Sequence, residues 1–303
     1  MFLKLNHTEI GYHTVLVKST ETTLSLGEVC LLIGNNGVGK TTLIKSILNQ
    51  IPILSGEIFI NQKNIKGLFS KEIAEQVAVV FSKYNVPANF TVSDLVALGK
   101  YIHYPYYFKL KKEDKEQVSE IIKSLNLQQY ENTALTDLSD GNLQKAFIGR
   151  ALAQNSPMII LDEPTTHLDE ENKIIILKLL RTLAKEQNKI ILFSSHDWRL
   201  AKEFSDKIWL IKNKTLQSGI AEDILLANSE LSAPQIFELS ANFVPPQIVA
   251  PNLQKELLIS FLQKNYKKDL SSFVFTFKDD FWLISKDNYQ QKVSSFIEIL
   301  DLV

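Results

Sequence analysis

One stretch of the chain decides how the rest is interpreted, and it reads Gly34-Asn35-Asn36-Gly37-Val38-Gly39-Lys40-Thr41, followed by Thr42. This stretch fits the pattern G-x-x-x-x-G-K-[ST] of a phosphate-binding loop. An apolar run of strand length precedes it at residues 28–33, and residues 41–48 follow with apolar side chains at helical spacing. Glycines let the backbone wrap closely around an anion, and N–H groups at a helix start point towards it. We therefore predict that residues 34–42 bind a nucleoside triphosphate; the alternative is a glycine-rich turn with a surface lysine.

Two side chains of this stretch carry specific chemistry. Lys40 places a mobile positive charge near the β- and γ-phosphates, which gives it a binding and a catalytic role. The hydroxyl of Thr41 is a ligand for Mg²⁺ in such loops. The sequence therefore predicts Mg²⁺ beside the nucleotide.

Composition limits the classes of protein that need to be considered. The 303 residues are 45% hydrophobic and 22% charged, as in a globular protein with room for one large domain and an appendage. The formal net charge of −1 gives no reason to expect a nucleic acid or an anionic membrane surface as partner. The one cysteine, Cys30, cannot form a disulfide within the chain, which favours a reducing compartment. The sequence shows neither a signal peptide nor an apolar run near the roughly 20 residues of a spanning helix, so we expect any membrane role to need a partner.

Apolar runs of strand length alternate with helical segments over most of the chain. Strands are expected at residues 2–12, 22–26, 57–61, 77–81, 158–161, 190–193 and 207–211. Between Pro87 and Pro157, three helical segments follow one another without a strand. We therefore expect an α/β fold of the P-loop NTPase type, with a mostly parallel central sheet, an antiparallel β subdomain and a helical insert at about residues 87–157.

The last part of the chain, residues 223–303, has a different pattern. Prolines are frequent between residues 233 and 251, which predicts a linker or an extended segment. A helix at residues 253–266, a hairpin formed by residues 272–276 and 281–285, and a helix at residues 292–300 are expected after it. These elements predict a small α+β extension, whose role the sequence does not indicate.

Two carboxylates, Asp162 and Glu163, stand directly after the predicted strand at residues 158–161. Successive side chains of a strand point in different directions, so the pair should separate. Asp162 is then placed to reach Mg²⁺, while Glu163 can act as a general base on a water in line with the γ-phosphate. His196 ends the neighbouring strand, where it can hydrogen-bond the γ-phosphate; the alternative is a core or helix-cap histidine.

A second anion site is predicted where Ser139 and Gly141 precede a helix. One chain with one phosphate-binding loop has no second phosphate to place there, but a dimer in which each chain covers the other's nucleotide does. The alternative is a simple helix cap. Tyr12, upstream of the loop, is either an aromatic plate for adenine or a half-buried tyrosine of the sheet.

The order of these motifs resembles the ATP-binding subunit of ABC transporters over residues 2–223. The matching segments are the phosphate-binding loop, Leu-Ser-Asp-Gly at 138–141, Ile-Leu-Asp-Glu-Pro-Thr-Thr at 160–166 and Ser-Ser-His-Asp at 194–197. The resemblance implies an ABC-type ATP-binding domain at residues 1–222, ATP and Mg²⁺ as cofactors, and a homodimer. It also implies that Ser139 and Gly141 bind the partner's γ-phosphate, that residues 166–169 cross the dimer interface, and that Tyr12 stacks on adenine.

The chain departs from the family pattern at two places. Asp140 and Asn142 stand where the family's signature has glycine and glutamine, and Ser82 replaces the glutamine expected after the strand at 77–81. Residues 89–101 and 194–201 resemble the importer branch for iron-siderophore, haem and cobalamin uptake. This implies transmembrane permease subunits as partners, indirectly an extracytoplasmic solute-binding protein, no nucleic acid, and a cytoplasmic location on the inner face of the membrane.

The sequence therefore favours a transport ATPase over two rivals. One rival is a soluble ABC-type ATPase that acts on DNA or ribosomes, and the other is a nucleotide-binding subunit that hydrolyses poorly and regulates. We expect the permease to dock in a shallow groove near the nucleotide, built from residues after the strand at 77–81 and at the start of the insert: Ser82, Lys83, Tyr84, Phe90, Leu95 and Tyr101.

Overall fold

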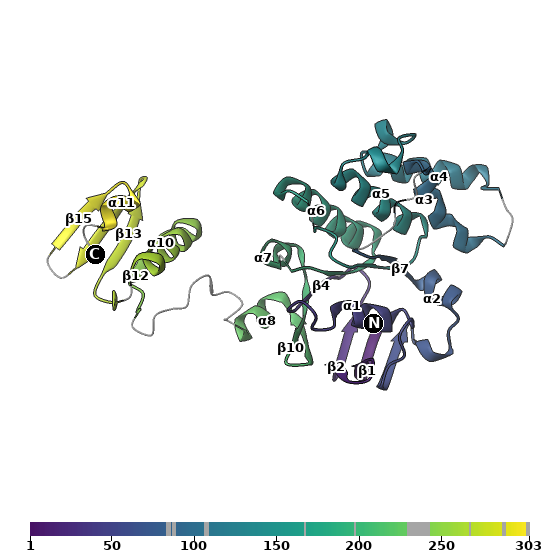
Figure 1. The fold of residues 1–303 in the computed structure, drawn as a ribbon, viewed down its shortest axis with the longest axis horizontal. Helices are drawn as coiled ribbons and strands as arrows, with labels where there is room; N and C mark the ends of the chain where they lie inside the picture. The colour runs from purple at the N-terminus through teal and green to yellow at the C-terminus, as the bar shows by residue number, and fades with distance from the viewer. Residues whose placement is uncertain are drawn as a thin grey trace. The chain divides into compact units, whose positions relative to one another are not determined.

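A computed structural model gives the structure of the chain and describes residues 1–82, 86, 89–105, 109–166, 168–196, 198–228, 243–266, 268–286 and 289–300. The chain divides into two compact units, which we call the N-terminal unit, Met1–Ile224, and the C-terminal unit, Leu225–Val303 (Figure 1). Each unit has its own hydrophobic core.

The N-terminal unit is built on one large mixed sheet. Its strands are β1 (Leu3–Gly11), β2 (Val15–Lys18), β3 (Glu21–Leu24), β4 (Val29–Ile33), β5 (Ser55–Ile60), β6 (Lys63–Asn64), β7 (Val77–Val80), β8 (Met158–Leu161), β9 (Ile190–Ser194), β10 (Lys207–Lys212) and β11 (Thr215–Ile220). Its helices are α1 (Lys40–Ile47), α2 (Ser70–Gln76), α3 (Val92–Leu98), α4 (Lys112–Ser124), α5 (Asp140–Ala153), α6 (Glu170–Gln187), α7 (Trp198–Ala201) and α8 (Ala221–Ala227), the last of which spans the boundary between the units. Short 3-10 helices lie at Ile65–Gly67, Gly99–His103, Gln128–Tyr130, Leu135–Asp137 and Lys202–Phe204.

Five strands of this sheet run parallel in the order β10-β4-β9-β8-β7. Their sequences are continuous apolar runs because both faces of the strands are buried. Leu32, Ile160 and Leu192 belong to the same core cluster as the buried face of α1. Their neighbours within the strands are buried as well: Leu31, Ile33, Ile159, Leu161, Ile191 and Phe193. The carboxyl ends of β4, β8 and β9 therefore meet at one edge, where ligands of such sheets bind.

The strands β1, β2, β3, β5 and β6 form the antiparallel part of the sheet. Helix α1 packs its Leu43 and Ile44 in the same cluster as Leu3 and Leu5 of β1, so it fills the space between the antiparallel and parallel strands (Figure 1). The α/β fold with a P-loop that the sequence predicts is thereby confirmed. Strand β2, which the sequence analysis did not predict, pairs with β1 through the register Ile10↔Val17.

Helices α3, α4 and α5 pack against one another in the part of the chain expected to be helical (Figure 1). Thr91 begins α3, because its hydroxyl accepts a hydrogen bond from the N–H of Asp94 and the Asp94 carboxylate accepts from the N–H of Thr91. Two side chains near the end of α5 fix it to β7 and to helix α2. Arg150 donates to the carbonyl of Val79 over 2.8 Å, and Gln154 donates to the carbonyl of Ala74 over 2.6 Å.

The C-terminal unit consists of a four-stranded sheet with two helices. Its elements are β12 (Gln247–Val249), α10 (Asn252–Asn265), β13 (Val274–Lys278), β14 (Phe281–Lys286), β15 (Tyr289–Val293) and α11 (Phe296–Leu300), with the strands in sequence order across the sheet. Its core is aromatic, with Phe275 and Trp282 in edge-to-face contact at 6.4 Å between ring centroids. The expected small α+β extension with its hairpin is present as a small sheet.

The predicted start of the last helix in this unit is wrong. Residues 292–300 were expected to be helical, but Lys292 and Val293 belong to β15, and α11 begins only at Phe296. Strand β15 pairs antiparallel with β14, which buries Val293 opposite Trp282. Such pairing depends on a neighbouring strand and not on local helical spacing. Of the expected proline-rich segment at residues 233–251, residues 233–242 lie outside the described residues, and the rest includes β12.

Among the described residues, no helix has the length and apolar character needed to cross a membrane.

Candidate functional site

The phosphate-binding loop connects β4 to α1 and requires glycine at particular positions. Gly39 precedes α1 with a φ of 113°, and a Cβ there would come within 2.9 Å of a methyl carbon of Val17. A Cβ at Gly34 would come within 2.9 Å of the backbone oxygen of Ile211. Glycine is therefore needed both for the backbone conformation and for the close approach of β2 and β10.

Lys40, the first residue of α1, folds its side chain back over this loop. Its ammonium donates to the carbonyl oxygens of Gly34 over 2.8 Å and Asn35 over 3.3 Å, and the residue is buried. Burial lowers the pKa of Lys40, while the nearby carboxylates of Glu163 and Asp162 act in the opposite direction. A buried cation at the start of a helix is a strong attraction for phosphate.

Thr41 and Asp162 meet at the same edge of the sheet. The Thr41 hydroxyl donates to Asp162 Oδ2 over 2.8 Å, although 121 positions separate the two residues in sequence. Asp162 is only 4% exposed, because it directly follows β8 between buried neighbours. The structure thus brings together the two residues predicted to face Mg²⁺.

Mg²⁺ binds oxygen ligands and is usually held by one or two protein groups together with substrate phosphates. The Thr41 hydroxyl and the Asp162 carboxylate are hard oxygen donors at 2.8 Å from each other, next to the phosphate-binding loop, and fit this requirement. Within the described residues, no group of three or more His, Cys, Asp and Glu side chains could hold a metal without such help.

Ser194, at the end of β9, also belongs to this cluster, although no role for it was predicted from the sequence. It is fully buried, and its hydroxyl donates to Asp162 Oδ1 over 2.7 Å. The Ser194 Oγ atom also accepts a hydrogen bond from the backbone N–H of Glu163 over 2.9 Å. One sequence feature could have identified Ser194: it is a polar residue at the end of an apolar strand, next to the strand that carries the two carboxylates.

Glu163 turns away from Asp162 and lies next to His196. Its φ of 55° is in the left-handed region, where a residue with a side chain is strained by about 1–2 kcal/mol. Its Oε2 accepts from the Thr166 hydroxyl over 3.3 Å and lies 3.5 Å from His196 Nδ1. The imidazole is half exposed at 52%, as a side chain that meets a ligand would be, whereas a core histidine would be buried. Asp197 and His167, which follow His196 and Thr166 in the sequence, lie outside the described part of the chain.

Tyr12 lies in the bend between β1 and β2 and is 58% exposed. The alternative of a half-buried sheet tyrosine therefore does not describe it. The same hairpin reaches the loop, because a Cβ at Gly39 would lie 3.3 Å from Leu16 Cβ and closer still to Val17. An aromatic ring on this hairpin is accessible to a ligand.

Ser139 immediately precedes α5, and Gly141 lies in the first turn of this helix. Ser139 caps the helix, since its hydroxyl accepts from the N–H of Asn142 over 3.4 Å. Gly141 packs against α6, where a Cβ would come within 2.9 Å of Asn172 Oδ1. In the described part of the chain, no hydrogen bond joins Ser139 or Gly141 to residues 34–42.

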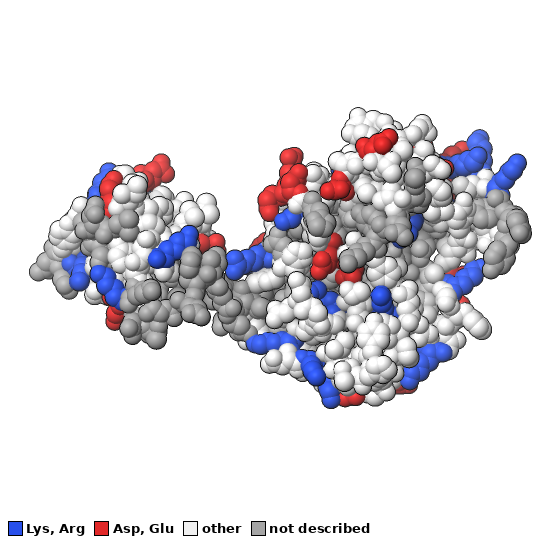
Figure 2. Space-filling model, viewed as in Figure 1, with Lys and Arg blue, Asp and Glu red and all other residues white. Residues whose placement is uncertain are grey.

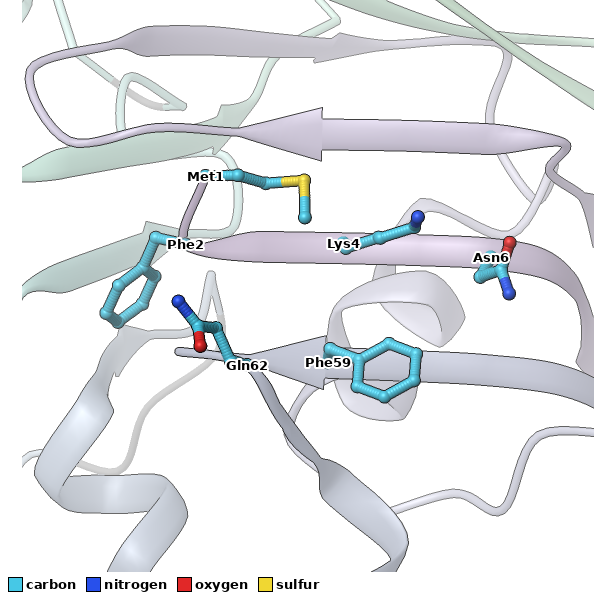
Figure 3. A pocket seen from close by; sticks show the side chains of 6 residues that line it. All are labelled: Met1, Phe2, Lys4, Asn6, Phe59 and Gln62. Carbon is cyan, nitrogen blue, oxygen red and sulfur yellow. The ribbon is translucent and has the colours of Figure 1, made fainter.

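A separate hollow of about 260 Å³ lies on the antiparallel part of the sheet, and its lining side chains are Met1, Phe2, Lys4, Asn6, Phe59 and Gln62 (Figure 3). Its one charged side chain, Lys4, pairs with Glu21 at 2.6 Å. The hollow gathers no carboxylate pair and no phosphate-binding backbone. Basic and acidic side chains are interspersed over the face seen in Figure 2. The candidate site is therefore the sheet edge formed by residues after β4, β8 and β9.

The family of the chain follows from its similarity to known proteins. A sequence model described as ABC transporter matches residues 17–166. An uncharacterised ABC transporter ATP-binding protein of Methanocaldococcus jannaschii is 36% identical over 74% of this chain and 78% of its own length. The chain belongs to the ATP-binding proteins of ABC transporters. The family predicted from the motifs is thus confirmed, and the chain is an ABC-type ATPase.

Named relatives of this ABC ATPase include importer subunits. The iron(3+)-hydroxamate import ATP-binding protein FhuC of Bacillus subtilis is 30% identical over 86% of this chain and 95% of its own length. The petrobactin import ATP-binding protein FpuC of Bacillus anthracis is 34% identical over 67% of this chain and 75% of its own length.

Solved structures show the same fold. An ABC transporter described as of the metal-chelate type, in an inward-facing conformation, matches with a TM-score of 0.66 and 26% identity over 74% of this chain and 85% of that chain. A dimeric ATP-binding cassette with bound ADP and phosphate matches with a TM-score of 0.64 and 25% identity over 72% of this chain and 98% of that chain. Cassettes of this family thus bind ATP or its products.

Proposed function

We propose that this ABC ATPase powers the import of an iron-siderophore, haem or cobalamin-type solute through a membrane permease. The carrying observation is the sheet-edge cluster, in which Lys40, Thr41 and Asp162 gather at the phosphate-binding loop and Glu163 lies beside His196. The names of the Bacillus relatives support an iron-chelate solute. The chain would then work at the inner face of the membrane, held there by the permease.

The side chains divide the chemistry between them. Residues 34–42 wrap the phosphates, with the N–H groups of Asn35 and Asn36 along the loop and Thr42 behind it. The Val38 N–H donates to the Asn35 carbonyl over 3.3 Å and so holds the loop closed. Thr41 and Asp162 hold Mg²⁺, which neutralises charge on the phosphates when bound. Glu163 orients and deprotonates the attacking water, and His196 hydrogen-bonds the γ-phosphate. Tyr12 stacks on the adenine.

A second copy of the chain completes each site. Ser139 and Gly141 present a hydroxyl and helix-start N–H groups that do not hydrogen-bond to their own phosphate-binding loop. The dimeric cassette of similar fold supports a homodimer. In this proposal the two chains are arranged head to tail, so that Ser139 and Gly141 contact the partner's nucleotide. The rival regulatory subunit, with poor hydrolysis, would retain this dimer but not the turnover that Glu163 and His196 provide.

The test of this proposal is ATP-dependent dimerisation. Protein carrying Glu163→Gln should shift from monomer to dimer when Mg²⁺-ATP is added, because binding is retained and release is slow. Adding Ser139→Arg to the same protein should abolish the shift, since a long cation replaces the hydroxyl at the interface. Sedimentation velocity with and without ATP measures both. A protein that stays monomeric at saturating ATP, even with a permease, would contradict the proposed assembly.

The permease should dock beside the nucleotide, at the end of β7 and the start of the helical segment. Of the expected groove residues, Ser82 and Tyr101 are exposed and Phe90 is half-buried, whereas Leu95 is only 2% exposed and supports α3 from within. Lys83 and Tyr84 lie outside the described residues. A partner surface of apolar side chains with a polar rim is typical of such contacts.

Charge substitutions should separate docking from hydrolysis. Phe90→Glu or Tyr101→Glu should abolish transport while basal ATP hydrolysis stays within about twofold, because a buried charge at an interface is strongly unfavourable. Ile220→Glu, at another exposed apolar side chain (56%), is the matched control and should transport normally. Transport in vesicles and co-purification with the permease measure the effect. If deletion of residues 228–303 abolishes co-purification and the two groove substitutions do not, the docking site lies in the C-terminal unit.

A further inference from the structure

Ser194 is a buried hydroxyl that contacts both acidic residues of the site. Its Oγ lies 2.7 Å from Asp162 Oδ1 and 2.9 Å from the backbone nitrogen of Glu163. We propose that Ser194 is a positioning residue: its hydroxyl holds Asp162 Oδ1, so that Oδ2 stays on the side of the Thr41 hydroxyl, where Mg²⁺ would bind, and at the same time it fixes the backbone of Glu163. This inference rests on the proposed site for Mg²⁺-ATP.

The directions of the two hydrogen bonds are forced by chemistry. A backbone N–H can only donate, so the bond from Glu163 uses a lone pair of the Ser194 oxygen. An ionised carboxylate can only accept, so the single hydroxyl proton of Ser194 points at Asp162 Oδ1. Both bonds together leave the hydroxyl without rotational freedom. At 0% exposure, the hydroxyl is also out of contact with bulk water.

The consequence is that the two oxygens of Asp162 have different tasks. Oδ1 is held by Ser194, while Oδ2 lies 2.8 Å from the Thr41 hydroxyl. The groups that support a metal-ligating carboxylate from behind fix its orientation and raise its affinity for the metal. Without the Ser194 hydroxyl, the carboxylate gains freedom to rotate out of the metal-binding orientation.

The same hydroxyl also acts on Glu163. This residue has a φ of 55°, so its backbone turns sharply directly after β8. The hydrogen bond from its N–H to Ser194 ties that turn to the end of β9, the strand that leads to His196. Ser194 therefore joins the metal carboxylate, the base and the strand of the histidine through one oxygen atom.

The experiment compares Ser194→Ala with Ser156→Ala. Ser156 is an equally buried serine, whose hydroxyl donates to the Ala74 carbonyl over 2.8 Å at the opposite end of β8. Mn²⁺ serves as the probe, and its binding in the presence of ADP is followed by electron paramagnetic resonance. We expect Ser194→Ala to bind Mn²⁺ about 10–100-fold more weakly, as is usual when a supporting group of a metal ligand is removed. Binding of ADP without metal should change less than about twofold, and Ser156→Ala should match the wild type in both.

Two further outcomes keep the inference separate from folding and from the proposed function. If Ser194→Ala does not fold, Ser194→Cys takes its place, because a thiol of similar size donates weakly and should lose Mn²⁺ affinity in the same direction. Wild-type Mn²⁺ affinity in a folded Ala or Cys variant overturns the inference. Failure of the wild type to hydrolyse ATP would instead contradict the proposed function, while the Mn²⁺ titration with ADP would still decide the role of Ser194.

Discussion

Glu163→Gln is expected to keep ATP binding and to lower ATP turnover by about 10²–10⁴-fold, the range that a positioned general base contributes. The substitution preserves size and shape, but the neutral amide cannot take a proton from the attacking water. The site argues for this role by geometry. Glu163 turns away from the buried Asp162, and its Oε2 is held by Thr166 and lies beside the half-exposed His196. Steady-state hydrolysis, together with binding of a fluorescent ATP analogue, separates turnover from affinity.

The matched control for Glu163→Gln is Glu57→Gln, which makes the same chemical change at an exposed glutamate of β5. That variant should hydrolyse ATP at the wild-type rate. Turnover within about threefold of the wild type in Glu163→Gln would remove Glu163 from the catalytic role, and the neighbouring His196 would then be the next candidate for the base.

The motifs could be assigned to elements from the sequence because their structure is local. The glycines at 34 and 39 indicate a turn that residues with a Cβ cannot form. The apolar runs that become β4, β8 and β9 are continuous because both faces of these strands are buried. Strand ends of a parallel sheet share one edge, so Thr41 and Asp162 could be expected to meet across 121 positions.

What could not be predicted depends on contacts between distant segments. Strand β2 is only four residues long, and β15 is rich in glutamine, so neither has a strong pattern of its own. Each becomes a strand because a neighbour, β1 or β14, offers a free edge. The role of Ser194 could not be predicted for the same reason, since this serine comes within hydrogen-bonding distance of Asp162 only when β9 pairs with β8.

Lys40→Ala is expected to weaken ATP binding itself by about 10–100-fold, since a hydrogen bond to a charged group contributes about 1.5–3 kcal/mol. The ammonium is buried and makes its hydrogen bonds to Gly34 and Asn35 of the loop. Its removal leaves the triphosphate facing the carboxylates of Asp162 and Glu163 without a neutralising charge. The measurement is ATP affinity in the presence of Mg²⁺, and Lys45→Ala, a half-buried lysine in the last turn of the same helix, is the control.

The pH dependence of ATP binding gives an independent check on Lys40. Burial lowers the pKa of its ammonium group, with Glu163 and Asp162 opposing that shift, and the phosphates bind the protonated form. ATP affinity should therefore be highest at neutral pH and should fall as the pH rises through the pKa of Lys40. This decrease should begin at a lower pH than it would for an ordinary lysine. In Lys40→Ala this alkaline decrease should be absent, whereas Lys45→Ala should retain it. An unchanged alkaline decrease in Lys40→Ala would show that another group carries the charge that the phosphates need.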